Sequence, residues 1–263
     1  MRSIQDAVNR IKIRAQMESV GYKPSYKCSK CKDTGVILVT STGEEIASTE
    51  VPQSMQGSYR AKKCTCSIES TIKKCIARSG IDIKEFEAKT FETFKTVTSE
   101  QKKMKQLAED FLDDKNAIGF GLFGKSGTGK THISIACINE ICKKGTSVLY
   151  FNYRRDIQEL IANKYDTINY NKLYGNWVSV PVLYIDDMFK FVMGNNGPAM
   201  EEMRIMFSLL NDRYINRKKT MFSSEMNGAE LIKLDEAIGS RIIEMCGKYC
   251  MRCTGENRRI KPC

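Results

Sequence analysis

A chain of 263 residues that is 41% hydrophobic and 28% charged can bury an ordinary core, which excludes a mainly disordered protein. It holds no apolar run of the roughly 20 residues that a membrane-spanning helix needs, and its first residues, MRSIQDAVNRIK, lack the apolar segment of a secretory signal, so we expect a cytoplasmic protein with no membrane partner. The net charge of +11 favours a polyanionic partner, with nucleic acid as the first candidate, although solubility alone would also explain it.

The first 80 residues form a basic segment that we expect to fold separately. Ile4, Val8, Ile11 and Ala15 recur at the spacing of one helix face. Residues 40–60 are polar with scattered Gly and Pro, as in a loop or the tip of a β-ribbon. The apolar stripe is either a partner-binding helix or a helix that packs on its own segment.

Two short cysteine pairs in this segment predict a structural zinc site. Cys28-x-x-Cys31 and Cys64-x-Cys66 can supply four thiolates in a tetrahedral arrangement, and the turn DTG after the first pair lets the chain fold back. A redox pair or free thiols are the alternatives. Zn²⁺ would stabilise a segment too small and polar to build much of a core, so we assign residues 1–80 to an N-terminal zinc-binding domain.

Residues 81–97 are predicted to form a linker, after which short apolar runs alternate with helical patterns. A helix is expected to begin at Thr98, because Thr98-x-x-Gln101 has the form of a capping box. Strands are expected at 117–123, 147–152, 180–186 and 220–224, and helices near 130–143, 154–164 and 198–217. This alternation is typical of a parallel sheet with helices on both faces, so the fold class of residues 98–263 is α/β.

The remaining cysteines follow secondary-structure patterns. Cys75, Cys137 and Cys142 lie in helical patterns and are expected to be buried apolar residues. The stretch CMRCT (250–254) alternates as a final strand. A second metal site is the alternative for the cysteines in this last region, which are Cys246, Cys250, Cys253 and Cys263.

The segment GKSGTGKT matches the phosphate-loop pattern G-x-x-x-x-G-K-[ST] in full, and it follows a predicted strand and opens a predicted helix. Glycines allow the tight turn that aims successive N–H groups at a phosphate, and the helix N-terminus adds partial positive charge. We expect Lys130 to reach the β- and γ-phosphates of ATP and Thr131 to ligate Mg²⁺. The expected nucleotide-binding residues of the loop are Gly124, Lys125, Ser126, Gly127, Thr128, Gly129, Lys130 and Thr131.

Two acidic residues end the predicted strand VPVLYIDD, in the manner of a Walker B motif. Asp186 is expected to hold Mg²⁺ directly or through water, and Asp187 to orient or polarise the attacking water. A solvated turn is the alternative for this acidic pair. Together with Lys130, these residues predict an ATPase. His132, the only histidine, is assigned a passive place in the helix.

In this order, the motifs resemble those of the bacterial helicase loaders of the DnaC/DnaI type, which are AAA+ ATPases together with the transposition ATPase IstB. The resemblance covers nearly the whole chain and rests on YKCSKCKDTG, KKCTC, KTFETFK (89–95), GLFGKSGTGKTHI, VLYIDD, NDRYINRKKT and LDEAIGSRI. It implies an AAA+ P-loop fold preceded by a zinc-binding domain. The short chain after Asn227 implies that a full helical C-terminal lid is missing, as in these loaders.

The resemblance also implies roles for further residues. Arg241 matches the arginine finger, which reaches the nucleotide of a neighbouring subunit and so implies an oligomer; a surface arginine is the alternative. Arg258 or Arg259 resembles the sensor-2 arginine, and we assign Arg259, with a solvated basic tail as the alternative. Where the family usually ends its fourth strand in Thr-Ser-Asn, this chain has Ser-Ser-Glu, so the sensor-1 position is Glu225 or is served by Ser224. A carboxylate there would repel the γ-phosphate unless it pairs with a cation or binds water.

As a function, the resemblance implies an ATP-dependent loader of a hexameric replicative helicase onto single-stranded DNA. ATP binding would assemble several copies, the N-terminal domain would bind the helicase, and hydrolysis would release the loader. Phe189 and Phe191, which flank Lys190, are candidates for a pore loop that stacks on bases, or else pack in the interior. The alternatives are an IstB-like transposition helper acting on duplex DNA, whose relatives lack the two cysteine pairs, and a zinc-bearing adaptor with ATP as a slow switch.

Overall fold

The computed structural model describes residues 25–49, 59–79, 83–190 and 199–258. The chain divides into two compact units, residues 1–70 and 71–263. The apolar stripe from Ile4 to Ala15, as well as Phe191 and Arg259, lies outside the described residues. In the part of the chain that is described, no helix has the length and apolar character needed to cross a membrane.

The first unit contains a small antiparallel sheet in the order β2-β1-β3. Its strands are β1 (Val36–Val39), β2 (Glu45–Ala47) and β3 (Arg60–Lys63). The first two form a ribbon whose tip turns at residues 40–44, which confirms the ribbon-tip interpretation for this part of 40–60. Helix α2 (Thr65–Ser79) begins directly after β3 and Cys64. One cysteine pair precedes β1 and the other follows β3. The pairing of these two strands therefore brings the two cysteine pairs close together.

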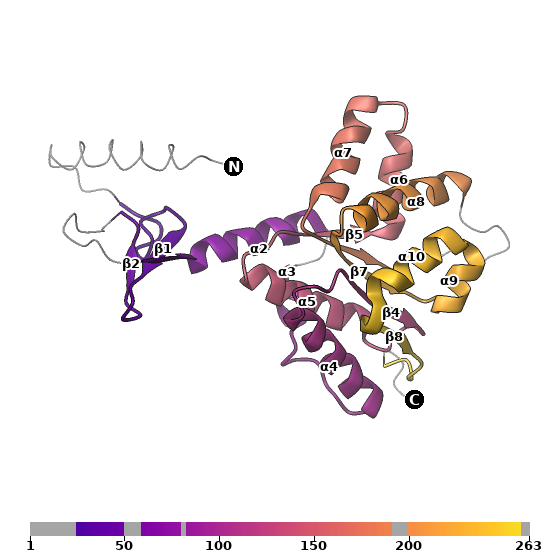
Figure 1. Ribbon diagram of the computed structural model, residues 1–263, viewed down its shortest axis with the longest axis horizontal. Helices are drawn as coiled ribbons and strands as arrows, with labels where there is room; N and C mark the ends of the chain where they lie inside the picture. The colour runs from indigo at the N-terminus through magenta and orange to yellow at the C-terminus, as the bar shows by residue number, and fades with distance from the viewer. Residues whose placement is uncertain (1–24, 50–58, 80–82, 191–198, 259–263) are drawn as a thin grey trace. The chain divides into compact units, whose positions relative to one another are not determined.

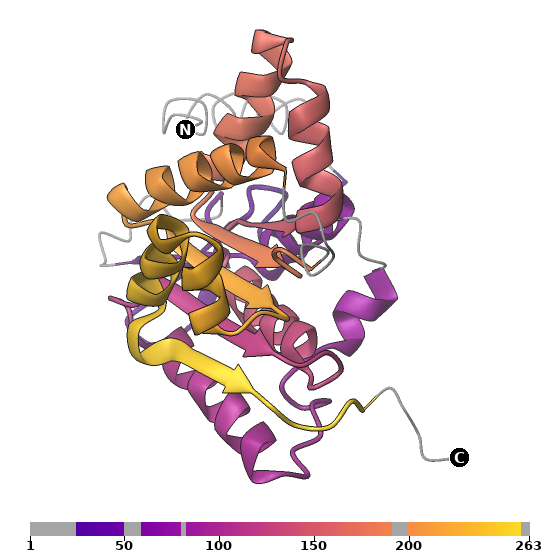
Figure 2. The ribbon, with the colours of Figure 1, turned by 90° about the vertical axis from the view of Figure 1, so that its right-hand side faces the viewer.

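The second unit is built on a five-stranded sheet in the order β5-β6-β7-β4-β8, with every neighbouring pair parallel. The strands are β4 (Gly119–Gly124), β5 (Val148–Asn152), β6 (Val182–Asp186), β7 (Lys219–Ser224) and β8 (Cys250–Cys253). The predicted parallel α/β architecture is confirmed. The carboxyl ends of all five strands lie at the same edge of the sheet (Figure 2). That edge is where ligands bind in open α/β sheets.

Helices cover both faces of this sheet (Figure 1). Residues alternate along the strands, so that Tyr150 and Tyr184 face one apolar core while Phe151 and Ile185 face the other. The first core is completed by α3 (Ile83–Ala88), α4 (Ser99–Asp113) and α5 (Lys130–Lys143). The second is completed by α6 (Tyr153–Ala162), α7 (Thr167–Ser179), α8 (Met200–Ile215), α9 (Gly228–Leu234) and α10 (Glu236–Cys246), with a 3-10 turn, η1 (Gly247–Tyr249), after α10.

The segment that we predicted as a linker packs into the second unit. Phe86, Phe91 and Phe94 are buried in the first core. Asn139 of α5 donates hydrogen bonds from Nδ2 to the carbonyls of Phe86 (3.0 Å) and Lys89 (2.9 Å). Burying three aromatic rings fixes this stretch against α5, so residues 83–94 belong to the ATPase-like unit rather than to a free connection. The domain boundaries at 80 and 97 otherwise stay a prediction.

Candidate functional site

The predicted phosphate loop lies between β4 and α5, at the carboxyl edge of the sheet. Gly124 and Gly127 have φ angles of 120° and 75°, which glycine adopts without strain. A Cβ at Gly127 would lie 1.8 Å from Oδ1 of Asn257, because the C-terminal segment crosses the loop closely. The N–H of Arg258 donates to the Gly127 carbonyl (3.1 Å), and that of Lys125 donates to the Cys253 carbonyl (3.0 Å).

Lys130 is the first residue of α5, and its side chain reaches back to the start of the loop. Its Nζ donates hydrogen bonds to the carbonyls of Gly124 (2.6 Å) and Lys125 (2.7 Å), and its side chain is almost fully buried. Burial lowers the pKa of Lys130. A buried cation held at the start of a helix attracts an anion strongly, because few water molecules screen its charge.

Asp186 ends β6 and is surrounded by hydroxyl groups. It accepts hydrogen bonds from Thr131 (3.3 Å), Tyr150 (2.5 Å), Tyr184 (2.5 Å) and Ser223. The two residues that we expected to hold Mg²⁺, Thr131 and Asp186, are thus in contact. A hard cation takes such oxygen ligands, one carboxylate and one hydroxyl, and keeps water in its other positions. The donor set therefore fits Mg²⁺.

Asp187 and Glu225 follow two neighbouring strands, β6 and β7, and share one cation. Nζ of Lys190 lies 2.7 Å from Oδ2 of Asp187 and 3.3 Å from Oε1 of Glu225. Although burial opposes it, the hydrogen bond and charge of Asp187, followed by those of Glu225, raise the pKa of Lys190. Ser224 is buried and donates to the Met188 carbonyl (2.6 Å). Of the two sensor-1 candidates, Glu225 therefore faces Lys190, whereas Ser224 holds the turn beneath it.

A cavity of about 410 Å³ adjoins the loop and gathers residues from distant parts of the sequence. It is lined by Lys89, Thr93, Lys95, Ser126, Gly127, Gly129, Lys130, Thr131, His132, Asp187, Lys190 and Arg258. We did not predict from the sequence that residues 89–95 would line this cavity. The signal was available in KTFETFK, whose buried Phe94 packs edge-to-face on His132 (5.1 Å between ring centroids).

Arg258 is the sensor-2 candidate that the structure describes. Its guanidinium lies 5.6 Å from the centroid of Phe94, and it lines the cavity. Our sequence assignment, Arg259, lies outside the described residues.

Arg241 lies on α10, away from the cavity lining in the described chain. Its Nε donates to Oδ1 of Asn211 (3.2 Å) and its Nη1 to the Ala237 carbonyl (2.7 Å), while its guanidinium covers the half-exposed ring of Phe207 at 5.0 Å. These contacts hold the arginine against α8.

The pore-loop hypothesis is wrong for Phe189. Its side chain is fully buried and packs edge-to-face on Tyr153 (5.1 Å between ring centroids). A ring in this position cannot stack on bases, because the core already covers it.

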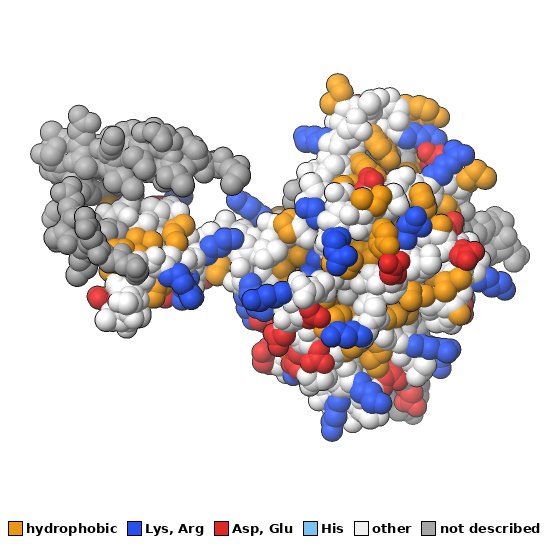
Figure 3. Space-filling view, viewed as in Figure 1, with side chains coloured by type: hydrophobic (Ala, Val, Ile, Leu, Met, Phe, Trp, Pro, Cys, Tyr) orange, Lys and Arg blue, Asp and Glu red, His pale blue; other side chains and the backbone are white. Residues whose placement is uncertain are grey.

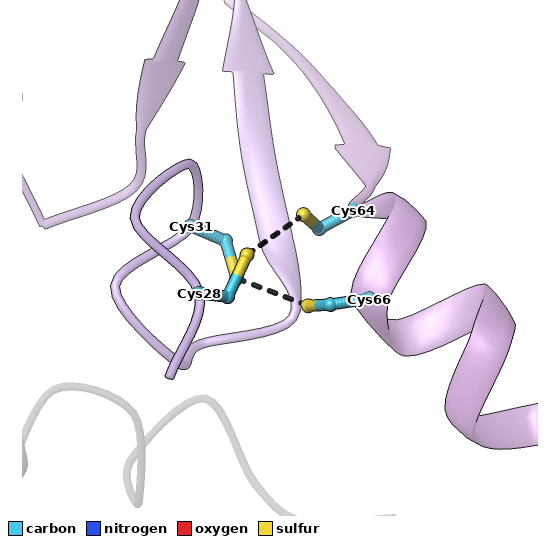
Figure 4. Close-up of side chains that lie close together, drawn as sticks. All are labelled: Cys28, Cys31, Cys64 and Cys66. Atoms are coloured by element: carbon cyan, nitrogen blue, oxygen red, sulfur yellow. Dashed lines mark hydrogen bonds between the residues drawn. The ribbon is translucent and has the colours of Figure 1, made fainter. Parts of the chain in front are cut away.

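The four N-terminal cysteines lie together in the first unit, with all sulfur atoms within 4.8 Å of one another (Figure 4). The Sγ atoms of Cys28 and Cys64 are 3.7 Å apart, and those of Cys31 and Cys66 are 3.4 Å apart. Zn–S bonds of about 2.3 Å place the sulfur atoms of a tetrahedral site about 3.8 Å apart, so the geometry fits Zn²⁺. The sulfur atoms are too far apart for disulfides.

The turn between the cysteine pairs is also shaped for a metal. The N–H of Cys28 donates to Oδ1 of Asp33 (2.8 Å), and the N–H of Gly35 points at Sγ of Cys31 (3.3 Å). The first bond holds the turn in shape, and an N–H that points at a cysteine sulfur, as that of Gly35 does, stabilises a metal-bound thiolate.

The C-terminal cysteines have a different environment. The one cluster of metal-ligating side chains in the described chain is the N-terminal one. Cys246 and Cys253 are buried in the apolar cores, and Cys263 lies outside the described residues. Burial raises the pKa of Cys253 to about 12, so its thiol stays protonated at neutral pH.

The strand order, the phosphate loop and the acidic pair at the end of β6 together define a P-loop ATPase fold of the AAA+ type. The sequence model of the IstB-like ATP binding proteins matches residues 77–248, and the chain belongs to this family. It is homologous to the DnaC helicase loader and the initiator DnaA.

Several relatives support this placement. The chain is 31% identical over 235 residues to the phage-like element PBSX protein XkdC of Bacillus subtilis (strain 168), covering 85% of this chain and 81% of that one. It is 26% identical over 147 residues to the replicative helicase loader DnaC of Escherichia coli (strain K12), covering 54% of each.

Solved structures show the same fold. A crystal structure of DnaI superposes with a TM-score of 0.54 at 23% identity, covering 68% of this chain and 94% of that one. A crystal structure of the DnaC helicase loader gives a TM-score of 0.53 at 18% identity, covering 65% and 98%.

Proposed function

We propose that the protein is an ATP-driven loader of a hexameric replicative helicase onto single-stranded DNA and acts in the cytoplasm. The observation that carries the proposal is the four-cysteine cluster of the first unit, in a chain whose second unit is an IstB-like ATPase fold. The resemblance drawn from the sequence implies that transposition helpers of this family lack the two cysteine pairs, which favours a loader. DnaC, a named replicative helicase loader, is a relative at 26% identity.

In this proposal, ATP binds in the cavity beside the phosphate loop. Lys130 and the N–H groups of residues 124–131 bind its β- and γ-phosphates. Thr131 and Asp186 hold Mg²⁺, which supplies charge neutralisation on the phosphate oxygens. Asp187 orients the attacking water and accepts its proton. Arg258 contacts the phosphates from the C-terminal segment.

The cysteine cluster provides a structural role. Cys28, Cys31, Cys64 and Cys66 hold Zn²⁺ in a closed four-thiolate site, which stabilises a unit whose buried apolar core in the described residues is small. We assign helicase binding to this unit.

Single-stranded DNA has a candidate surface on the hairpin of α6 and α7. Tyr165 and Ile168 are exposed there, at 89% and 82%, beside the exposed cations Lys164 and Lys172. The bases of single strands stack on exposed aromatic rings, such as that of Tyr165, and neighbouring lysines neutralise the charge of the phosphates. By contrast, acidic side chains gather over α4 and α5, where they line a groove (Figure 3). That acidic face would repel nucleic acid.

The test is size-exclusion chromatography with light scattering, using the replicative helicase of the source organism with and without ATP. We expect a stable co-eluting complex that is lost when Cys28 and Cys31 are both replaced by Ser. Cys250→Ser is the matched control, because Cys250 is a half-buried cysteine outside the cluster. Its complex should persist.

Other outcomes would favour the alternatives. Without a helicase complex, ATP-dependent assembly on duplex DNA would favour an IstB-like transposition helper. Binding to ATP is tested separately by Lys130→Ala, which should abolish it. If that variant binds ATP normally, the nucleotide site has been wrongly assigned.

A further inference from the structure

Lys190 links the two acidic residues that follow β6 and β7. Its ammonium lies within hydrogen-bond distance of Asp187 and forms an ion pair with Glu225, and all three side chains are partly exposed. Lys190 and Asp187 line the same cavity as Lys130 and Thr131. An anion bound at the phosphate loop would therefore meet a second lysine.

The backbone fixes Lys190 in this place. The N–H of Lys190 donates to the Asp187 carbonyl (3.2 Å), which closes a tight turn, and Asp187 and Phe189 both have positive φ angles, 52° and 59°. The N–H of Met188 donates to the Ser223 carbonyl (2.9 Å). The buried Phe189 anchors the turn in the core. A positive φ angle costs free energy in a residue other than glycine. The surrounding contacts must therefore hold the backbone of this turn in place.

Charge explains why a cation is needed here. Asp187 and Glu225 would place two carboxylates beside a phosphate site, and their repulsion would weaken the binding of a nucleotide. Lys190 neutralises part of this charge. Where the family's fourth strand usually ends in asparagine, this chain has Glu225. Lys190, three residues after Asp187, compensates for the added negative charge.

We propose that Lys190 binds the terminal phosphate of ATP and that Glu225 is the residue that positions it. This proposal rests on the proposed function, since it requires ATP in the cavity. When the ammonium contacts the γ-phosphate, it withdraws from Asp187, and that carboxylate becomes free to accept a proton. One proton of the attacking water passes to Asp187, the water oxygen bonds to the γ-phosphorus, and the bond to the β,γ-bridging oxygen breaks with its electron pair on ADP.

The experiment compares the affinity of Lys190→Met for ATPγS and for ADP, both with Mg²⁺, by titration calorimetry. ADP lacks the phosphate that Lys190 contacts. We expect ATPγS to bind roughly tenfold or more weakly, as for a lost hydrogen bond to a charged group. The affinity for ADP should stay within about twofold.

The double variant Lys190→Met/Glu225→Gln tests the charge argument. It removes a carboxylate that the single variant leaves without its cation, so ATPγS affinity should recover in part. Lys143→Met is the matched control, because Lys143 forms an ion pair of the same 2.7 Å length with Glu140 on the surface of α5. It should bind both nucleotides as the original chain does.

Equal weakening for ATPγS and ADP, or no weakening of either, would overturn the role of Lys190. Failure of the ATP-binding part of the proposed function looks different, since then the original chain binds neither nucleotide, and failure of helicase loading alone is seen in the co-elution test and leaves this comparison unchanged. The fluorescence of Trp177, the only tryptophan, reports whether each variant is folded. If Lys190→Met does not fold, Lys190→Gln is measured and judged by the same comparison.

Discussion

The only histidine of the chain ties the segment before the sheet to the phosphate loop. Nε2 of His132 lies 3.0 Å from the Thr90 carbonyl, which can only accept, so this nitrogen carries a proton and donates. The ring also packs against Phe94. Burial lowers the pKa of His132 below its ordinary value of 6.5, although the bond to Thr90 works in the opposite direction.

This pKa shift predicts a loss of stability in mild acid. The unfolded chain takes up a proton on His132 near pH 6.5, whereas the folded chain does so only at lower pH. The contribution of His132 to the free energy of unfolding is therefore fully present above pH 6.5 and is lost as the pH falls through the folded pKa. His132→Gln should lack this loss in denaturant titrations at several pH values.

A direct measurement is available because the chain has one histidine. Its imidazole proton resonance, followed by NMR against pH, should titrate with a midpoint below 6.5, while the chain in urea should titrate near 6.5. A folded midpoint at or above 6.5 would contradict the burial of this ring.

Residues in contiguous motifs could be predicted from the sequence, and their partners could not. Lys130 and Asp186 were found because a loop pattern and a strand end fix their place in the chain. Tyr150 and Ser223 bond to Asp186 only because β5 and β7 flank β6, and the sequence does not reveal that order. The pairing of Glu225 with Lys190 depends on the same adjacency of β6 and β7.

At the scale of elements, strong local signals located most of the second unit. The capping box at Thr98 is present as predicted, and α5 spans Lys130–Lys143 as expected. Helix α7 was missed because its sequence, TINYNKLYGNWVS, contains a glycine and β-branched residues and has Trp177 as its one buried side chain. Tertiary contacts, rather than local preference, stabilise such a helix.

Arg213 connects the end of α7 to the start of β7. Its side chain is fully buried, and its guanidinium donates to Thr220 Oγ1 (2.9 Å) and to the carbonyls of Trp177 (2.8 Å), Val178 (3.1 Å), Val180 (3.0 Å) and Lys219 (2.6 Å). Burial lowers the pKa of Arg213 to about 9, so the group still carries its charge at neutral pH. One cation thus satisfies the carbonyls at the end of a helix and at the start of β7.

We expect Arg213→Met to lower the free energy of unfolding by about 3 kcal/mol or more, because several buried carbonyls lose their donor. Urea unfolding followed by Trp177 fluorescence measures this change locally, since the Trp177 carbonyl is one of the acceptors. Arg204→Met on the exposed side of the same helix is the control and should change stability by less than about 0.5 kcal/mol. A similar small change for both variants would show that the Arg213 network is not stabilising.

At the scale of the whole molecule, the position of Arg241 bears on assembly. Within the described chain it contacts residues of α8 and α10 and does not line the cavity beside the phosphate loop, so we do not expect it to contact a nucleotide bound in its own subunit. Asn211 and Phe207 hold its guanidinium at a partly exposed site. An arginine held in this way can serve a neighbouring copy of the chain, provided that ATP assembles several copies.

We expect Arg241→Ala to bind ATP normally and to hydrolyse it much more slowly, because a trans-acting arginine stabilises charge in the transition state and contributes about 10³-fold or more to the rate in related reactions. Mixing Arg241→Ala with Lys130→Ala provides the test. A mixed interface can pair an intact phosphate loop from the first variant with an intact arginine from the second. The steady-state ATPase rate of the mixture should therefore exceed the sum of the separate rates, and it should peak at an intermediate ratio. If no ratio gives more than this sum, Arg241 does not act on a neighbouring subunit.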